Sequence, residues 1–421
     1  MTATVPLRPA PAPGMPPLAD LAEEFGTPAY VYDLAAVRSA HADLRAALPQ
    51  PSDLHYSLKA NPHPRIVAQL AALGCHAEVA SSGEVDHAVE AGLAPELIQL
   101  AGPAKTAATV SHALDRGVRR FSVDSPADLA AVERLAAARG RRVDCLLRVN
   151  ADESVPGTGL TMTGVASQFG ADASWIARDP GAFRGRGAAR VVGLHLYAGT
   201  NLKDEDALLA QFEVSVRIAA GLARALGGLD EVNLGGGFGA PYAVGGQRPR
   251  FAALAARLSD LLDTHLPGWR AGAPRVSFES GRYLVGDSGT LLSRVVEVKV
   301  SKGRTFVLLD AGVNHLGGMS GLRRLRPMQP TLLPVSGVET GEAVRCAVVG
   351  PLCTPLDMLS PDAVLAGPEA GGLLAVPNVG AYGLSASLIA FLGHPAPVEV
   401  VTDGGRVVDV SRLALRRVSI R

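Results

Sequence analysis

Short apolar runs alternate with longer amphipathic runs between Asp33 and Glu279. The short runs have the length of buried strands, and the longer runs carry apolar residues at helical spacing. The predicted strands are His55–Leu58, His76–Val79, Ile98–Leu100, Arg120–Val123, Asp144–Val149, Val191–Leu196, Glu231–Leu234 and Val276–Phe278, and the predicted helices include Pro64–Leu73, Gly83–Ala91, Pro126–Ala138 and Glu205–Leu226. Eight strands, most of them followed by a helix, predict a (β/α)8 TIM-like barrel, with an open doubly wound sheet as the alternative architecture.

The pattern changes after Arg282. Valine-rich strands are predicted at Leu291–Lys299 and Thr305–Leu309, and helical periodicity mostly disappears, which predicts a second, all-β domain of the sandwich or barrel kind. The strand-like segment Pro28–Tyr32 precedes the barrel, and we expect it to join that second domain. The expected domains are therefore 1–32 (a tail and a strand of the β-domain), 33–280 (the barrel) and 281–421 (the β-domain).

The composition narrows the class of protein. A chain of 421 residues is too long for one compact core, and 40 basic residues against 40 acidic ones give no reason to expect nucleic acid as a partner. No apolar run reaches the roughly 18 residues of a membrane helix, and Pro6–Pro17 lacks the charged and apolar regions of a signal peptide. The four cysteines form no C-x-x-C pair and no zinc-like spacing, so we expect free thiols, no metal site and a cytoplasmic protein.

Lysine is scarce in this chain, and Lys59 lies in the most specific motif of the sequence. The segment His55–Pro62 reads as a strand followed by a lysine and a turn. Since the carboxyl ends of barrel strands face the active site, Lys59 is well placed to bond covalently to an aldehyde cofactor. The alternative is a lysine at the barrel rim that keeps its charge in water.

Two further motifs follow predicted strands. The glycine run Leu234–Gly239 would let backbone N–H groups approach a phosphate, although many tight turns look the same. In Phe278–Arg282, the carboxylate of Glu279 would keep the ring nitrogen of a cofactor protonated, and a surface salt bridge between Glu279 and Arg282 is the alternative.

Two more motifs lie in the predicted β-domain. Gly350–Asp357 places Cys353 in a turn-rich segment, where a lone cysteine is more often a small buried hydrophobic residue than a reactive thiol. Val379–Gly383 sets Tyr382 close to two glycines, either as a packing residue or as a phosphate ligand.

These motifs, in this order, resemble the fold-type III pyridoxal-phosphate decarboxylases, which include the diaminopimelate and the eukaryotic-type ornithine decarboxylases. The resemblance runs from about residue 28 to about residue 391, and Arg148–Asn150 and Ser167–Gly170 also look like family segments. It implies pyridoxal 5′-phosphate as the cofactor, removal of the α-carboxylate of an amino-acid substrate, and a homodimer with shared active sites.

The resemblance also implies a role for each matching residue. Lys59 matches the lysine that carries the cofactor, and Glu279 matches the glutamate at the pyridine nitrogen. Cys353 matches the thiol that reaches in from the partner subunit and protonates the substrate carbon after carbon dioxide has left. Cofactor-binding positions are expected at Tyr197, Thr200, Gly236, Gly237, Gly281, Arg282 and Tyr382.

Two departures from the family pattern concern ring stacking and the substrate. Tyr197 stands where the family commonly has a histidine that stacks on the cofactor ring. Thr354 stands where diaminopimelate and ornithine decarboxylases usually carry an acidic residue that meets the distal amine of the substrate. A smaller subgroup matches better, namely decarboxylases of butirosin-type and macrolactam antibiotic assembly. These act on an acidic amino acid thioesterified to an acyl carrier protein, and the neutral thioester needs no counter-charge.

The expected substrate and partner residues lie after position 300. Asp310, Thr354 and Asp357 are predicted to meet the substrate or the partner subunit, and the residues after Asp310 depart from the diaminopimelate pattern. One short segment carries three arginines, Arg323, Arg324 and Arg326. They are predicted to meet an acidic carrier protein or the phosphate of its pantetheine arm, and the alternative is a basic loop that is merely solvated.

Three other functions compete with this interpretation. The first is decarboxylation of a free amino acid such as diaminopimelate, ornithine, lysine or arginine. The second is racemisation, but alanine-type racemases place an arginine at the pyridine nitrogen, where Glu279 stands. The third is a non-catalytic regulator, against which the presence of both Lys59 and Cys353 argues.

Overall fold

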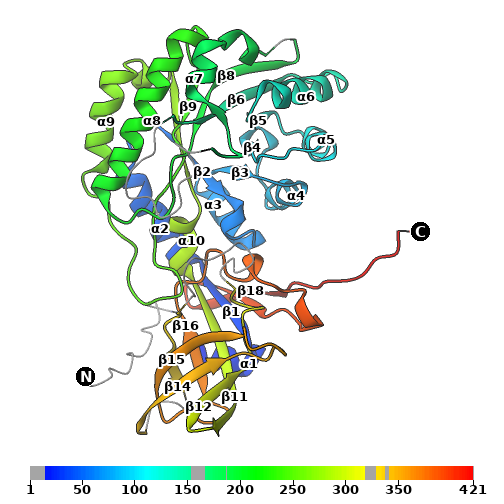
Figure 1. Cartoon of the computed structure of the whole chain (residues 1–421), viewed down its shortest axis with the longest axis vertical. Coiled ribbons are helices and arrows are strands. Elements are labelled where there is room, and N and C mark those ends of the chain that lie inside the picture. The colour runs from blue at the N-terminus through cyan, green and yellow to red at the C-terminus, as the bar shows by residue number, and fades with distance from the viewer. Residues whose placement is uncertain (1–14, 153–165, 186, 318–328, 337–340, 421) are drawn as a thin grey trace. The chain divides into compact units, whose positions relative to one another are not determined.

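The computed structural model describes residues 15–152, 166–185, 187–317, 329–336 and 341–420. The chain forms two compact units. We call the first the barrel unit, which comprises the described residues of 38–240 and 248–284. The second, the sheet unit, comprises the described residues of 1–37, 241–247 and 285–421. Figure 1 labels most of the helices and strands of both units.

The barrel unit contains a closed ring of parallel strands. The ring consists of β2 (Asp53–Ser57), β3 (His76–Val79), β4 (Ile98–Leu100), β5 (Arg120–Val123), β6 (Val143–Asn150), β8 (Ala189–Leu196), β9 (Glu231–Asn233) and β10 (Arg275–Ser280). The strand order is β5-β4-β3-β2-β10-β9-β8-β6, and a further pairing of β5 with β6 closes the ring. The predicted barrel is confirmed, and the open sheet is excluded because the closed ring leaves no edge strand.

Helices follow most strands of the ring (Figure 1). They are α3 (Pro64–Ala72), α4 (Ser82–Glu90), α5 (Ala107–Asp115), α6 (Pro126–Ala137), α7 (Ala173–Arg178), α8 (Glu205–Leu226), α9 (Leu254–His265) and the short α10 (Arg282–Val285). A further helix, α2 (Leu34–Ala47), precedes the first ring strand, and the two-residue strand β7 (Ala171–Asp172) pairs in parallel with the end of β6. Ser81, Thr106, Ser125 and Asp204 each accept a hydrogen bond from a backbone N–H of the first turn that follows. Such caps satisfy donors that the helix leaves unpaired, so they fix where each helix starts after its strand.

The ring strands carry polar and apolar side chains alternately, although both faces are buried. In β10, for example, the polar Ser277 and Glu279 alternate with the apolar Val276 and Phe278, and all four are 2% exposed or less. Successive side chains of a strand point to opposite faces, so one face of the ring is polar and the other apolar.

Contacts between strands that are not neighbours show that the polar face lines the interior. Arg120 of β5 donates to the carboxylate of Glu231 of β9 at 2.5 Å, and Ser122 of β5 is 2.7 Å from the imidazole of His195 of β8. Only side chains inside the ring reach across it in this way. The interior therefore depends on ion pairs and hydrogen bonds, whereas most such barrels are filled with branched apolar residues.

The sheet unit is built on a nine-stranded sheet in the described part of the chain. Its strands are β1 (Ala29–Asp33), β11 (Gly289–Ser301), β12 (Arg304–Leu309), β13 (Leu333–Ser336), β14 (Ala343–Val349), β15 (Met358–Ala366), β16 (Leu373–Val376), β17 (Val398–Asp403) and β18 (Arg406–Arg412). The N-terminal strand β1 lies between β11, which is antiparallel to it, and β17, which is parallel to it.

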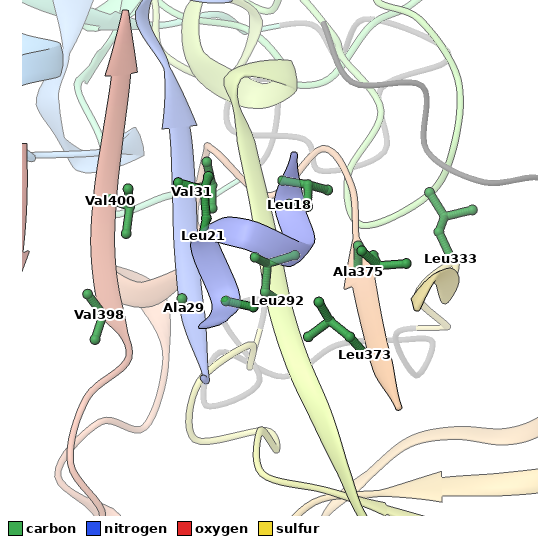
Figure 2. Close-up of a cluster of buried hydrophobic side chains, with 12 residues drawn as sticks. Leu18, Leu21, Ala29, Val31, Leu292, Leu333, Leu373, Ala375, Val398 and Val400 are labelled. Carbon is green, nitrogen blue, oxygen red and sulfur yellow. The ribbon is translucent and has the colours of Figure 1, made fainter. Parts of the chain in front are cut away.

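A helix that the sequence pattern did not predict packs on this sheet. In α1 (Leu18–Phe25), the side chains of Leu18 and Leu21 are buried against the sheet residues Val31 and Leu292, as Figure 2 shows. The unit is therefore mostly sheet with one covering helix. The helical spacing of the apolar residues is present in the sequence, but eight residues are too few to stand out beside a proline-rich segment.

The described residues also bear on thiols, metals and membranes. Cys75, Cys145 and Cys346 are buried, Cys353 is exposed, and none of the four forms a disulfide. Among these residues, no group of three His, Cys, Asp or Glu side chains is placed to hold a metal ion. Every described helix is too short or too polar to cross a bilayer.

Replacing Glu231 with Gln should lower the free energy of unfolding by about 3 kcal/mol, because the largely buried Arg120 loses its counter-charge. Asp230→Asn is the matched control, since this neighbouring carboxylate is 66% exposed and pairs with Arg190. Its loss should cost less than about 1 kcal/mol. Urea titrations followed by circular dichroism measure both changes, and equal losses would contradict the importance of the buried pair.

Candidate active site

Lys59 lies just past the carboxyl end of β2. The strand ends at Ser57, one residue earlier than predicted, and a 3-10 turn, Leu58–Ala60, follows. The Lys59 side chain is 47% exposed, and its Nζ lies 3.5 Å from Oε2 of Glu78 on β3. The same Nζ lies 6.0 Å from the centre of the Tyr197 ring, so the amine sits between a carboxylate and an aromatic ring.

Glu279 lies near the end of β10 and is 2% exposed. Its Oε1 accepts a hydrogen bond from Nδ2 of Asn233 at 2.9 Å and lies 3.2 Å from Nε2 of His195. Burial by itself would raise the pKa of Glu279, but the His195 imidazole and the Lys59 amine outweigh burial and hold that pKa below its usual value. The alternative of a surface salt bridge is wrong, because this carboxylate is buried.

The sequence interpretation gave no role to His195 and Asn233. Both are buried, both contact the Glu279 carboxylate, and His195 also contacts Ser122 on the far side of its ring. The available signal was a polar residue at alternate positions of an otherwise apolar, buried strand. That pattern predicts which side chains face the barrel interior, but it does not predict which of them contact one another.

The glycine run after β9 makes a tight turn that only glycine tolerates. Gly235 and Gly237 have φ angles of +70° and +113°, in the region that L side chains rarely adopt. At Gly236, a Cβ atom would lie 2.3 Å from the carbonyl oxygen of Glu279, so the run lies flat against the end of β10. Gln211 of α8 supports the turn by donating to the carbonyl of Gly236 at 2.8 Å.

Two backbone donors in this turn are available to an anion. The N–H groups of Gly236 and Gly237 are buried, and neither has a hydrogen-bond partner among the residues that the structure describes. Buried backbone N–H groups are almost always paired. The turn therefore suits a ligand with strong acceptor oxygens, as a phosphate has.

Further predicted residues gather at the same strand ends. A Cβ atom at Gly281 would lie 2.8 Å from Cβ of Ala60, so this glycine lets the end of β10 approach the turn that carries Lys59. Arg282 begins α10, and Thr200 is half-buried just after β8. The barrel unit thus brings together Lys59, Tyr197, the glycine run, Glu279 and Gly281.

The loop that carries Cys353 belongs to the sheet unit and is held by Asp357. This carboxylate is 2% exposed and accepts hydrogen bonds from the backbone N–H groups of Leu352 (2.7 Å) and Val313 (2.8 Å). The thiol of Cys353 is exposed, and the Thr354 hydroxyl accepts from the backbone N–H of Leu356 at 3.3 Å. These contacts give Asp357 an internal role, and its contact with substrate or partner stays a prediction.

Asp310 and Tyr382 also have internal contacts in the sheet unit. Asp310 accepts hydrogen bonds from Thr27, Ser293 and the backbone of Arg294 at 2.5–2.9 Å. Tyr382 has a φ angle of +55°, and its carbonyl accepts from the Tyr242 hydroxyl at 2.9 Å. A tyrosine in this conformation costs on the order of 1 kcal/mol, and such strain is concentrated at functional sites.

The predicted docking residues Arg323, Arg324 and Arg326 lie outside the described residues.

Comparison with known families decides the chemistry of this site. The family described as "Pyridoxal-dependent decarboxylase, pyridoxal binding domain" matches residues 34–286. The chain belongs to this family of pyridoxal-dependent decarboxylases. The predicted enzyme class and cofactor, pyridoxal 5′-phosphate, are confirmed.

Relatives of this decarboxylase extend over nearly the whole chain. The L-glutamyl-[BtrI acyl-carrier protein] decarboxylase of Niallia circulans is 32% identical over 91% of this chain and 91% of its own length. The diaminopimelate decarboxylase of Zymomonas mobilis is 28% identical, covering 93% and 91%. The crystal structure of diaminopimelate decarboxylase from Helicobacter pylori complexed with L-lysine matches with a TM-score of 0.81 at 27% identity, covering 94% and 96%.

The donor set of the barrel unit suits each part of pyridoxal 5′-phosphate. The amine of Lys59 would bond to its aldehyde carbon, and the buried carboxylate of Glu279 would face its ring nitrogen. The unpaired N–H groups of Gly236 and Gly237 would donate to its phosphate. The barrel unit therefore contains all three kinds of group that the cofactor would need, namely an amine, a carboxylate and backbone donors.

The Glu84→Gln variant should gain stability relative to the wild type as pH rises from 5 to 8. Glu84 lies beside Glu78 and Lys59 and accepts from the backbone N–H of Ala80 at 2.7 Å, and burial raises its pKa from 4.5 to about 7. The folded protein therefore holds a proton that the unfolded chain releases. The stability from that proton is fully present below about pH 4.5 and is lost as pH rises through about 7.

Urea titrations of both proteins at several pH values measure this difference. Glutamine keeps an acceptor for Ala80 but cannot ionise. A stability difference that stays constant from pH 5 to 8 would show that Glu84 has an ordinary pKa.

Proposed function

We propose that this decarboxylase removes the α-carboxylate of an acidic aminoacyl group, aspartyl or glutamyl in type, that is thioesterified to an acyl carrier protein. The observation that carries the proposal is Thr354, a neutral residue next to Cys353 where family members that act on free basic amino acids usually have an acid. The 32% identity to a decarboxylase named for a glutamyl group on an acyl carrier protein supports it.

The physical argument concerns the far end of the substrate. A distal ammonium group taken out of water without a counter-charge costs several kcal/mol, so a site for a basic amino acid needs a carboxylate there. A thioester is neutral, and the hydroxyl of Thr354 meets it without such a cost. The neighbouring Leu356 is 81% exposed and adds an apolar surface to the same loop.

Decarboxylation of a free amino acid is the second candidate. Diaminopimelate decarboxylases among the relatives, at 28% identity over 93% of this chain, favour it. The two candidates differ in the distal group of the substrate, so a direct comparison of substrates separates them.

In the proposed mechanism, the residues of the barrel unit hold the cofactor and set its charge. When bound, pyridoxal 5′-phosphate takes up the electron pair that remains at the substrate Cα after carbon dioxide leaves. Glu279 holds a negative charge at the ring nitrogen, which favours protonation there. The ring of Tyr197 provides an apolar face for stacking, and Gly236 and Gly237 bind the phosphate together with Thr200, Gly281, Arg282 and Tyr382.

The proton that replaces the carboxylate comes from a thiol in this proposal. Cys353 donates its S–H proton to Cα as a general acid. We propose a homodimer in which Cys353 of the partner subunit serves each barrel, with Asp310 and Asp357 ordering the segments around it. We further propose a cytoplasmic enzyme, in keeping with four unpaired cysteines, and docking of the carrier protein on Arg323, Arg324 and Arg326.

The substrate assay measures carbon dioxide release from aspartyl and glutamyl carrier-protein thioesters beside free diaminopimelate, ornithine, lysine and arginine. We expect kcat/KM for one thioester to exceed that for every free amino acid at least a hundredfold. Thr354→Asp should lower the thioester value about tenfold, because an unpaired carboxylate then faces a neutral group, whereas Thr354→Ser should stay near the wild type. Turnover of free amino acids alone would refute the carrier-protein proposal and leave the decarboxylase.

Subunit mixing tests the proposed roles of Lys59 and Cys353. Lys59→Ala should lose turnover and the visible absorbance of lysine-bound cofactor, and Cys353→Ala should slow turnover while keeping that absorbance. A mixed dimer of the two variants has one intact site of its two if the site is shared. Random exchange of equal amounts makes about half of the dimers mixed, so about a quarter of wild-type activity should return. No recovery after proven subunit exchange would show that each site is built within one chain.

A further inference from the structure

A chain of buried polar side chains lies behind Glu279. Ser122 of β5, His195 of β8, Asn233 of β9 and Glu279 of β10 are each 2% exposed or less. Ser122 Oγ lies 2.7 Å from His195 Nδ1, and His195 Nε2 lies 3.2 Å from Glu279 Oε1. Four strands of the ring therefore contribute to one connected group that ends at the carboxylate.

The orientation of the two donors to Glu279 follows from their other contacts. Asn233 Oδ1 accepts from the backbone N–H of Gly235 at 2.8 Å, so its Nδ2 is the end that donates to Glu279. Ser122 Oγ and His195 Nδ1 are 2.7 Å apart, and either atom of that contact can donate. On the other side of the ring, the Glu279 carboxylate, 3.2 Å from Nε2, can only accept, so the neutral tautomer that suits both neighbours has its proton on Nε2 and accepts from Ser122 at Nδ1.

We propose that His195 is a positioning residue that keeps Glu279 ionised and aimed at the cofactor ring nitrogen, by presenting an Nε2–H donor held by Ser122. This inference rests on the proposed role of Glu279. It adds a residue to which the sequence interpretation gave no function, and it makes the tautomer of His195 part of the site.

The other charged groups near Glu279 do not replace this donor. Burial, followed by the neighbouring His76, lowers the pKa of His55 to about 3, so His55 is neutral at working pH. The amine of Lys59 would bond to the cofactor and would then no longer be a free ammonium beside Glu279. Arg120 already contacts the carboxylate of Glu231. Without His195, the buried carboxylate would keep only the neutral Asn233 and would take up a proton more readily.

The first experiment titrates the apoenzyme with pyridoxal 5′-phosphate between pH 6 and 8, following absorbance and the dissociation constant. Relative to the wild type at the same pH, His195→Leu should bind the cofactor about tenfold more weakly at pH 6 and approach the wild type at pH 8, because protonation of Glu279 removes its charge. His195→Gln keeps an N–H donor and should restore most of the affinity.

Gln99→Leu is the matched control. Gln99 is fully buried, and neither of its amide atoms has a hydrogen-bond partner in the part of the chain that the structure describes. The Gln99→Leu variant therefore removes a polar side chain from the barrel interior but leaves the contacts of Glu279 in place. The ratio of its cofactor affinity to that of the wild type should be independent of pH. A His195→Leu ratio that is equally flat from pH 6 to 8 would overturn the proposal.

A second readout uses the apoenzyme alone, so it holds even if His195→Leu fails to fold. Nitrogen-15 spectra of the imidazoles, assigned with His195→Gln, should show a proton on Nε2 of His195. An unprotonated Nε2 would refute the inference.

Glu279→Gln separates this inference from the proposal on which it rests. If Glu279→Gln leaves the absorbance and affinity of the cofactor unchanged, the proposed role of Glu279 fails. If Glu279→Gln changes them and His195→Leu does not, only the inference about His195 fails.

Discussion

The buried carboxylate of Glu279 is the constraint around which the carboxyl ends of β8, β9 and β10 are organised. An ionised group removed from water is tolerated only when partners satisfy it, and here they come from separate strands. Asn233 and His195 supply them, and Asn233 at the same time holds the amide of Gly235. One side chain, Asn233, therefore holds both the Glu279 carboxylate and the glycine turn.

The same constraint extends down the barrel. Glu231 is as deeply buried as Glu279, and two arginines meet its carboxylate. A polar interior gives up part of the hydrophobic stabilisation of an ordinary barrel, but it places charges that do not need to reorganise during a reaction. Rigid strands hold these buried groups, which suits chemistry that depends on a fixed electrostatic environment.

The sheet unit contains a loop that is built on a buried aspartate. Asp357 accepts from the backbone of Leu352 within the loop and of Val313 in a separate segment, and Cys353 in this loop is exposed. The other cysteines are buried, and burial raises the pKa of Cys75 to about 12 and that of Cys346 to about 11. The chain therefore presents one accessible thiol, on a loop with a defined shape.

The barrel, most of its strands and helices, the family and the cofactor could all be predicted from the sequence. These follow from local periodicity and from short motifs such as the segment around Lys59, which stay together along the chain. The sequence did not reveal α1, the closing pair of β5 with β6, or the roles of His195 and Asn233. Ring closure decides which side chains meet inside the barrel, and it depends on pairing between strands far apart in sequence. Only the tertiary structure could therefore show that Glu279, expected as either a cofactor ligand or a surface ion pair, lies buried against a histidine and an asparagine from two other strands.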